Sequence, residues 1–250
     1  MRALDAEHYV LDVQLRRERV PSFDRYPFSL PALRHFERLE LHPAVTFVVG
    51  ENGSGKSTLL EGIAAAWGFN PEGGTKNFRF STRASHSELH EHLRLGKSYR
   101  RPKDGFFLRA ESFFNVATEI EELDRGPGGP PIIDSYGGQS LHDQSHGESF
   151  FALMTHRFGG HGFYVLDEPE AALSPARQLA MLRRLHELVQ KKSQFVIATH
   201  SPILMSYPDA WIYQIDEGGL SRVAYRDTEH YELTRAFLNS PESFLRGLLE

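Results

Sequence analysis

The sequence predicts an α/β fold, with a mixed central sheet flanked by helices, a small antiparallel β part near the N-terminus and a helical insertion. Short apolar runs typical of buried strands alternate with longer segments of helical periodicity. A glycine-rich turn at residues 50–58 separates one such run from one such helix. In sheets of this kind ligands bind beyond the carboxyl ends of the strands, so this turn marks the expected site.

The apolar pattern places the elements in order along the chain. We expect strands at residues 9–15, 34–41, 44–49, 105–110, 163–166, 194–198, 211–215 and 220–225. We expect helices at residues 57–67, 111–123, 146–158 and 175–192, and two more that begin near Thr228 and Pro241. The polar, basic residues 71–104 predict a helical or lid insertion that contributes little to the core, with helical spacing over 87–95. The Gly-Pro-Gly-Gly-Pro-Pro run within residues 125–138 predicts a mobile loop.

Composition limits the class of protein. The chain has 250 residues, of which 40% are hydrophobic and 24% charged, which suits one domain (residues 1–250) with a full core. A net charge of -5 gives no global attraction for nucleic acid, so any such contact needs a local basic patch. The absence of cysteine excludes disulfides and thiolate metal sites, which fits a cytoplasmic location. No apolar run is long enough to span a bilayer, so we expect no direct membrane insertion.

The glycine-rich turn has the pattern of a phosphate-binding loop. Its residues are Gly50, Glu51, Asn52, Gly53, Ser54, Gly55, Lys56, Ser57 and Thr58. The glycines allow a tight path whose backbone N–H groups surround phosphates, and the following helix adds its positive N-terminal end. Lys56 is expected to reach the β- and γ-phosphates, and the Ser57 hydroxyl to hold Mg²⁺. We therefore expect the chain to bind a nucleoside triphosphate.

An acidic pair ends a second buried strand. The apolar run 163–166 leads directly into Asp167 and Glu168, so both carboxylates lie at the carboxyl end of that strand. This is the pattern of a Walker B strand, in which Asp167 helps to hold Mg²⁺ beside the phosphates. Glu168 is then expected to position and activate the water that attacks the γ-phosphate. The alternative is that two acidic residues simply end a strand.

With these two motifs, the chain resembles the ABC-type ATPase superfamily, and in particular compact predicted ATPases of the Asp-Glu-Pro-Glu type that are related to DNA-repair and phage-defence ATPases. About twenty residues before the Walker B strand, where the family has its Leu-Ser-Gly-Gly-Gln signature, Ser145 and Gly147 match. His146 replaces the first glycine, and Glu148 replaces the glutamine. The resemblance implies a helix whose start contacts the γ-phosphate held by a second subunit. An ordinary helix cap is the alternative.

Further residues fit the resemblance. His200, in an Ala-Thr-His-Ser-Pro segment after a buried strand, is similar to the family's switch histidine, which implies that it bonds the γ-phosphate and detects its loss. Glu111 stands where the family has a glutamine beside Mg²⁺, and it is either a metal ligand or a helix-start acid. Ser174 stands where many transporters of the family have aspartate. Tyr26 or Phe28 lies where an aromatic ring stacks on adenine, although we favour core packing for them.

Two further features have two interpretations each. His86, His90 and His92 have a spacing that suits a divalent metal on one helix face, but a solvated polar helix explains it as well. The basic run from Lys97 to Lys103 surrounds Tyr99. It suits either weak contact with nucleic-acid phosphates or a surface lid near the nucleotide.

The sequence therefore predicts an enzyme that hydrolyses ATP with Mg²⁺ and dimerises head to tail around it. Each site is expected to combine Lys56, Ser57, Asp167, Glu168 and His200 of one chain with Ser145, Gly147 and Glu148 of the other. Within this set, Lys56, Glu168 and His200 are the expected catalytic residues. Hydrolysis then drives a conformational change in an unknown protein partner. The alternatives are the ATP-binding subunit of an ABC transporter, a nucleotide switch that does not hydrolyse, and a P-loop kinase.

Overall fold

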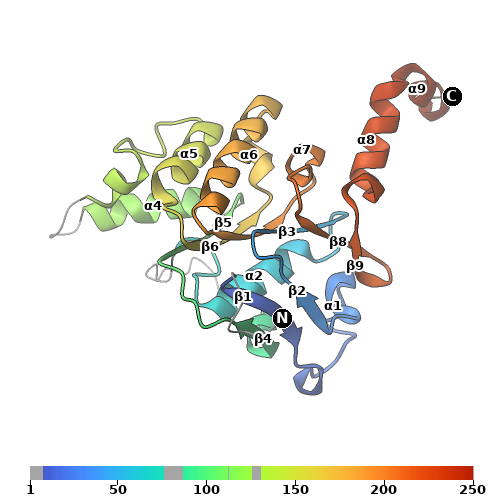
Figure 1. The fold of residues 1–250 in the computed structure, drawn as a ribbon, viewed down its shortest axis with the longest axis horizontal. Coiled ribbons are helices and arrows are strands. Elements are labelled where there is room, and N and C mark those ends of the chain that lie inside the picture. The colour runs from blue at the N-terminus through green and yellow to red at the C-terminus, as the bar shows by residue number, and fades with distance from the viewer. Residues whose placement is uncertain (1–7, 76–86, 112, 126–130, 250) are drawn as a thin grey trace.

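The computed structural model describes residues 8–75, 87–111, 113–125 and 131–249, and the strands in these ranges form two sheets (Figure 1). The larger sheet contains, in spatial order, β5 (Asp104–Arg109), β6 (Gly162–Asp167), β7 (Gln194–Ala198), β3 (Val45–Gly50), β8 (Trp211–Asp216) and β9 (Gly219–Val223). Neighbouring strands are parallel except for β8 and β9, which form an antiparallel hairpin. The predicted mixed central sheet is confirmed.

The smaller sheet is the N-terminal antiparallel part that the sequence predicts. It contains β2 (Arg38–Glu40), β1 (Val10–Leu15) and β4 (Leu93–Lys97), with β1 in the middle. The buried side chain of Gln194, at the start of β7, joins the two sheets. Its oxygen accepts from the N–H groups of Tyr9 and Val10, and its amide nitrogen donates to Val10 O.

Helices cover both faces of the larger sheet. On one face lie α1 (Pro31–Arg34), α2 (Lys56–Trp67), α3 (Leu89–His92) and the smaller sheet. On the other lie α4 (Phe113–Asp124), α5 (His146–Ala152), α6 (Pro175–Gln190) and α7 (Pro202–Met205). Every residue of β3, β6 and β7 is buried as a result, which explains why their sequences are mostly apolar.

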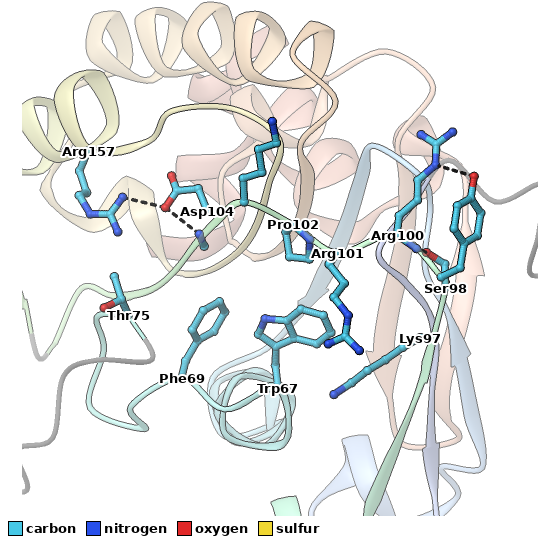
Figure 2. A pocket seen from close by; sticks show the side chains of 13 residues that line it. Trp67, Phe69, Thr75, Lys97, Ser98, Arg100, Arg101, Pro102, Asp104 and Arg157 are labelled. Atoms are coloured by element: carbon cyan, nitrogen blue, oxygen red, sulfur yellow. Dashed lines mark hydrogen bonds and ion pairs between the residues drawn. The ribbon is translucent and has the colours of Figure 1, made fainter.

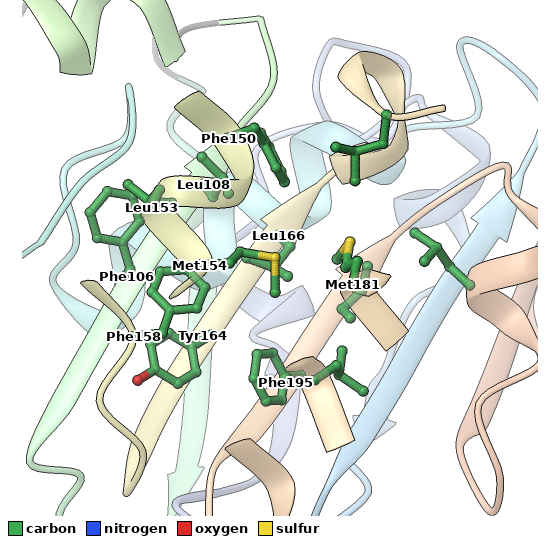
Figure 3. Packing of buried hydrophobic residues seen from close by; sticks show 14 of the residues in the cluster. Phe106, Leu108, Phe150, Leu153, Met154, Phe158, Tyr164, Leu166, Met181 and Phe195 are labelled. Atoms are coloured by element: carbon green, nitrogen blue, oxygen red, sulfur yellow. The ribbon is translucent and has the colours of Figure 1, made fainter. Parts of the chain in front are cut away.

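Side chains that alternate along each strand divide the core into two layers. Phe163 and Val165 of β6 pack towards α2, whereas Tyr164 and Leu166 pack towards α5 and α6. In the second layer the ring of Tyr164 stacks between Phe158 and Phe195, with ring centroids 4.3 Å and 5.0 Å apart (Figure 3). The parallel register brings the carboxyl ends of β6, β7 and β3 to one edge of this packed sheet, where the site is expected.

Two predicted segments fold differently. Residues 87–95 were expected to be helical with little core contribution, but only α3 is helical and β4 follows at once. Leu89 of α3 and Leu93, the first residue of β4, are both buried in the core cluster that α2 and β1 share. The strand expected over 34–41 begins only at Arg38, because Pro31 starts a short helix that extends to Arg34.

Smaller differences concern helix ends and loops. The helix expected over 146–158 stops at Ala152 and continues as a π-helical turn over Leu153–Arg157. Within the predicted loop 125–138, Ile132–Tyr136 forms a 3-10 helix that buries Tyr136, and 126–130 lie outside the described residues. Of the insertion expected over 71–104, residues 76–86 also lie outside them.

The last two helices, α8 (Glu229–Asn239) and α9 (Pro241–Leu249), extend away from the sheet (Figure 1). No residue of either helix is buried, and α8 adjoins the rest of the fold at its first turns, where Thr228 is the N-cap. As with the other helices in the described ranges, neither is long and apolar enough to cross a membrane.

Candidate active site

The loop between β3 and α2 has a backbone path that only glycine adopts easily at three positions, Gly50, Gly53 and Gly55. Gly50 has φ 151°, and a Cβ there would lie 2.9 Å from the carbonyl oxygen of Ile215. Gly55, the N-cap of α2, has φ 99°, in the left-handed region. The tight turn therefore presents its backbone N–H groups and the start of α2 to one point, as a phosphate site requires.

Lys56 lies inside this loop. Its side chain is buried, and Nζ donates to the carbonyl oxygens of Gly50 and Glu51, each at 2.8 Å. Burial lowers the pKa of Lys56, while Glu168 and Asp167 nearby act in the opposite direction. The ammonium group is thus held at the mouth of the loop, where phosphate oxygens would approach it.

Ser57 and Asp167 meet as the sequence predicts. The Ser57 hydroxyl donates to Oδ1 of Asp167 at 3.0 Å, which joins the start of α2 to the end of β6. Asp167 is only 4% exposed, and burial raises its pKa to about 7, although Arg109 and the Ser57 bond act to lower it.

A hydroxyl and one carboxylate are oxygen ligands of the kind that Mg²⁺ prefers. The described residues contain no group of three or more His, Cys, Asp or Glu side chains suited to a metal. An ion at Ser57 and Asp167 would therefore complete its shell with phosphate oxygens and water, as Mg²⁺ commonly does beside a nucleotide. The site fits Mg²⁺ together with a nucleotide.

Arg109, at the end of β5, connects the carboxylates around this point, and the sequence analysis gave it no role. Its Nη1 lies 2.9 Å from Glu61 of α2, and its Nε lies 3.6 Å from Oδ2 of Asp167. Glu111 lies 3.4 Å from Nη2 of Arg109, with its own side chain 82% exposed. In the register of β5 and β6, Arg109 is directly opposite Asp167, so the cation and not Glu111 contacts the buried carboxylate.

Glu168 and His200 also come together. Oε1 of Glu168 lies 3.4 Å from Nε2 of His200, which follows the adjacent strand β7. Glu168 has φ 49°, a left-handed conformation that costs a non-glycine residue roughly 1–3 kcal/mol and that is typical of functional sites. Glu170, to which no role was assigned, accepts from the backbone N–H of His200 at 2.5 Å, and burial raises its pKa.

A second histidine orients the first. Nδ1 of His200 lies 3.0 Å from Nε2 of His230, in the first turn of α8. The carboxylate of Glu168, 3.4 Å away, attracts a proton on Nε2 of His200 without forming a hydrogen bond to it; with the proton placed there, His230 donates from its own Nε2 to Nδ1 of His200. Nδ1 of His230 would then be unprotonated, and it is indeed buried without a hydrogen-bond partner among the described residues. Burial, followed by the nearby His200, lowers the pKa of His230 and favours its neutral form.

Buried polar atoms without a hydrogen-bond partner gather at this site, although such atoms are rare in folded proteins. Within the described part of the chain they include Ser54 Oγ, Arg109 Nε, Glu170 Oε2, His200 Nε2 and His230 Nδ1. Two of these residues, His200 and His230, line an open cavity of about 390 Å³, together with Glu51, Asn52, Glu229 and Leu233. Unpaired polar groups beside a cavity suit a polar ligand.

The expected signature residues lie elsewhere. Ser145 is the N-cap of α5 and forms a capping box with Glu148, whose Oε2 accepts from the Ser145 N–H at 3.1 Å. Gly147 is required by packing, since a Cβ there would lie 2.6 Å from the carbonyl oxygen of Ala172. Helix α5 packs on the face of the sheet opposite α2, so this chain does not bring its own signature to its own loop. The side chain of His146 lies outside the described residues.

Among the remaining candidates, Phe28, His90 and Ser174 contact other residues of the fold. Phe28 is buried against His92, with ring centroids 5.0 Å apart, whereas Tyr26 is exposed. Nδ1 of His90 lies 3.3 Å from the carbonyl oxygen of Ser87, and His86 lies outside the described residues. The Ser174 hydroxyl caps α6 by accepting from Arg177 N.

Comparisons with known proteins agree with this geometry. A family model described as an AAA domain matches residues 26–116, and a second, described as "AAA domain, putative AbiEii toxin, Type IV TA system", matches residues 133–206. No curated protein sequence matches the chain significantly.

Among solved structures, the chain is similar to cbiO1 from Clostridium perfringens, part of the ABC transporter complex cbiONQ, at 16% identity and a TM-score of 0.52, over 94% of this chain and 96% of that one. The SMC head domain from Thermotoga maritima matches at 19% identity and a TM-score of 0.46, over 86% of this chain and 98% of that one. Likeness at such identities concerns the fold. Taken with the two AAA-domain matches, it supports the resemblance found in the sequence: the chain has a P-loop ATPase fold of the ABC and AAA kind.

Proposed function

We propose that the chain hydrolyses ATP and dimerises head to tail around it. The pairing of Glu168 with His200 carries the hydrolysis part of this proposal. A partly exposed carboxylate that can accept a proton lies beside a ring nitrogen that can donate one, and both adjoin the phosphate-binding loop. A module that only binds nucleotide has no need of such a pair.

Each residue of the proposed site has its own role in ATP hydrolysis. The loop 50–58 and Lys56 hold the β- and γ-phosphates, while Glu168 orients the attacking water and accepts its proton. His200 donates from Nε2 to an oxygen of the γ-phosphate. Mg²⁺, when bound by Ser57 and Asp167, neutralises charge that develops on the phosphate oxygens. For Glu111 we propose an indirect role, through its contact with Arg109.

The position of α5 supports the dimer. Ser145 is exposed at the start of α5, and α5 lies across the sheet from the chain's own loop. A second copy that docks head to tail would supply its Ser145, Gly147 and Glu148 to the γ-phosphate and complete the site. Loss of the γ-phosphate would then loosen the interface, which makes the dimer a two-state engine for a protein partner.

We favour such an engine over the ATP-binding subunit of a transporter. The signature departs from the family pattern at His146 and Glu148, and Ser174 caps a helix where transporters have aspartate. The absence of cysteine from the sequence fits the cytoplasm as the place of action.

The test is Glu168→Gln, which keeps the shape of the side chain but removes its basicity. Turnover of ATP should fall about 10²- to 10⁴-fold, while ATP still binds and a dimer accumulates that light scattering detects. The control is Glu187→Gln on the surface of α6, which removes the same charge far from the loop and should behave as wild type. Unchanged turnover in Glu168→Gln would contradict hydrolysis at this site, and a monomer with ATP bound would contradict the shared site.

A further inference from the structure

A second cavity, of about 520 Å³ (Figure 2), lies at the other end of the sheet from the nucleotide site, as the strand register shows. Its lining includes Trp67, the last residue of α2, and Asp104, the first residue of β5. Asp104 is paired with Gly162, the first residue of β6, whereas Asp167 is the last. Six strand residues separate the two ends by roughly 17 Å. The basic run at this cavity is therefore no lid over the nucleotide, which excludes one of the two interpretations given to it from the sequence.

The cavity is strongly basic although the chain as a whole is acidic. Its cationic residues are Lys97, Arg100, Arg101, Lys103 and Arg157, and its acidic residue is Asp104. The carboxylate of Asp104 is already engaged, because it accepts from Arg157 Nη1 and from the Tyr164 hydroxyl, each at 2.7 Å. Burial alone would raise the pKa of Asp104, but a bond from the Gly159 N–H, Arg157 and Tyr164 together lower it.

Asp104 and Arg157 thus cancel one another, and the basic run keeps its charge. Within the described part of the chain, no carboxylate forms an ion pair with Lys97, Arg101 or Lys103. The positive charges of this run must therefore be balanced by water, salt ions or an anionic ligand.

The spacing of the cations indicates which anion fits. Residues 97–103 connect β4 of the smaller sheet to β5 of the larger one and span roughly 20 Å if extended. Figure 2 shows Lys97 and Arg101 directed towards Trp67, while Arg100 extends away from them, with its Nε 3.3 Å from the Tyr99 hydroxyl. Because Arg100 points away from the other two, the cations of the run do not all converge on one phosphate group. They suit successive charges along an extended polyanion.

Tyr99 indicates which kind of extended polyanion fits. Its ring is 59% exposed in the middle of the basic run, with the guanidinium group of Arg100 5.8 Å from the ring centre. An exposed aromatic ring among cations can stack on an unpaired base while the cations contact the backbone, which is how proteins bind single strands without sequence preference. A duplex keeps its bases inside and gains nothing from such a ring.

We propose that this cavity and its basic rim bind single-stranded nucleic acid. Lys97, Arg101 and Lys103 contact successive phosphates, and Tyr99 stacks on a base between them. These contacts are made to phosphate charges and to the face of any unpaired base, so binding is independent of sequence and weakens steeply with salt. The proposal does not depend on ATP hydrolysis.

The test is fluorescence anisotropy with a labelled thymidine oligonucleotide of about 15 nucleotides, without ATP, at about 50 to 200 mM salt. Arg101→Gln with Lys103→Gln should weaken binding and reduce the slope of log affinity against log salt by about 0.7 for each cation removed. Tyr99→Leu should weaken binding roughly 5- to 100-fold with little change in that slope. Thermal unfolding shows whether each variant is folded.

Matched controls are Arg183→Gln and Arg246→Gln, which remove two exposed charges from α6 and α9. They should leave binding unchanged. The proposal would be overturned by three results: no binding at the lowest salt, equal affinity in the Arg101 and Lys103 double variant, or equal displacement by duplex DNA or polyglutamate.

Discussion

Replacing His230 by leucine should slow ATP turnover about tenfold while the KM for ATP stays close to that of the wild type. The bond of 3.0 Å between His230 Nε2 and His200 Nδ1 holds the His200 ring with its Nε2 towards Glu168 and, in the proposed site, towards the γ-phosphate. Without it, the proton of His200 can move to Nδ1, and the donor to the γ-phosphate is lost. Phosphate binding itself depends on the loop and Lys56, which the change does not touch.

The magnitude follows from the environment of the bond. A buried polar group that loses its partner costs about 1–3 kcal/mol, which corresponds to roughly 5- to 150-fold in rate. The His200 side chain is 30% exposed, so water can replace part of the lost bond. The effect should therefore lie near the lower end of that range, at about tenfold. His230→Gln, whose amide can still donate, should recover most of the rate.

The assay is steady-state phosphate release over a range of ATP concentrations, with His200→Ala and the double variant measured beside His230→Leu. Because His230 acts through His200, adding His230→Leu to His200→Ala should cause no further loss. Normal turnover in His230→Leu would refute the reasoning. So would a loss that adds in full to that of His200→Ala, or a glutamine variant as slow as the leucine variant.

Three other predictions follow from the same site and core. Lys56→Ala should abolish the ATP-dependent dimer as well as turnover, because Lys56 holds the phosphates that join the two copies; a dimer by light scattering with ATP present would contradict this. Arg109→Met should raise the pKa of Asp167 above its value of about 7, because it removes the cation that lowers it. Since Mg²⁺ needs the ionised carboxylate, the acidic limb of the activity profile should move to higher pH, and an unmoved limb would contradict the role of Arg109. Asp104→Asn should lower the free energy of unfolding by about 2–4 kcal/mol in urea at neutral pH, because Arg157 keeps a half-buried charge without its partner. The folded-state pKa of Asp104 is lowered from 3.8, so its contribution is present above that value and is lost as pH falls through the folded pKa; a stability difference that persisted in strong acid would be the contrary result.

The sequence predicts well the elements whose residues all share one kind of environment. Strands β3, β6 and β7 are buried on both faces, so their sequences are mostly apolar and identify them directly. The loop at 50–58 can also be predicted from its own sequence, because its glycines are required by the backbone angles of the turn itself. The prediction for residues 87–95 was wrong. Leu89 and Leu93 are four residues apart, which fits a helix, but pairing with β1 makes the second part of this segment a strand.

The site likewise contains residues that the sequence predicts and residues that it does not. Lys56, Ser57, Asp167, Glu168 and His200 lie in motifs whose order along the chain already indicates phosphate chemistry. The residues that surround them come from separate elements, and only the fold brings them in. They are Glu61, Arg109, Glu170 and His230.

This division has a physical cause. A group that touches phosphate or Mg²⁺ must sit at a strand end or helix start, which leaves a local mark in the sequence. A group that sets the charge of another only needs to lie within a few ångströms of it, and any element can deliver it. Arg109 sits 58 residues before Asp167 and His230 sits 30 residues after His200, yet each contacts its target. The protonation states on which turnover depends are therefore properties of the folded chain and not of its motifs.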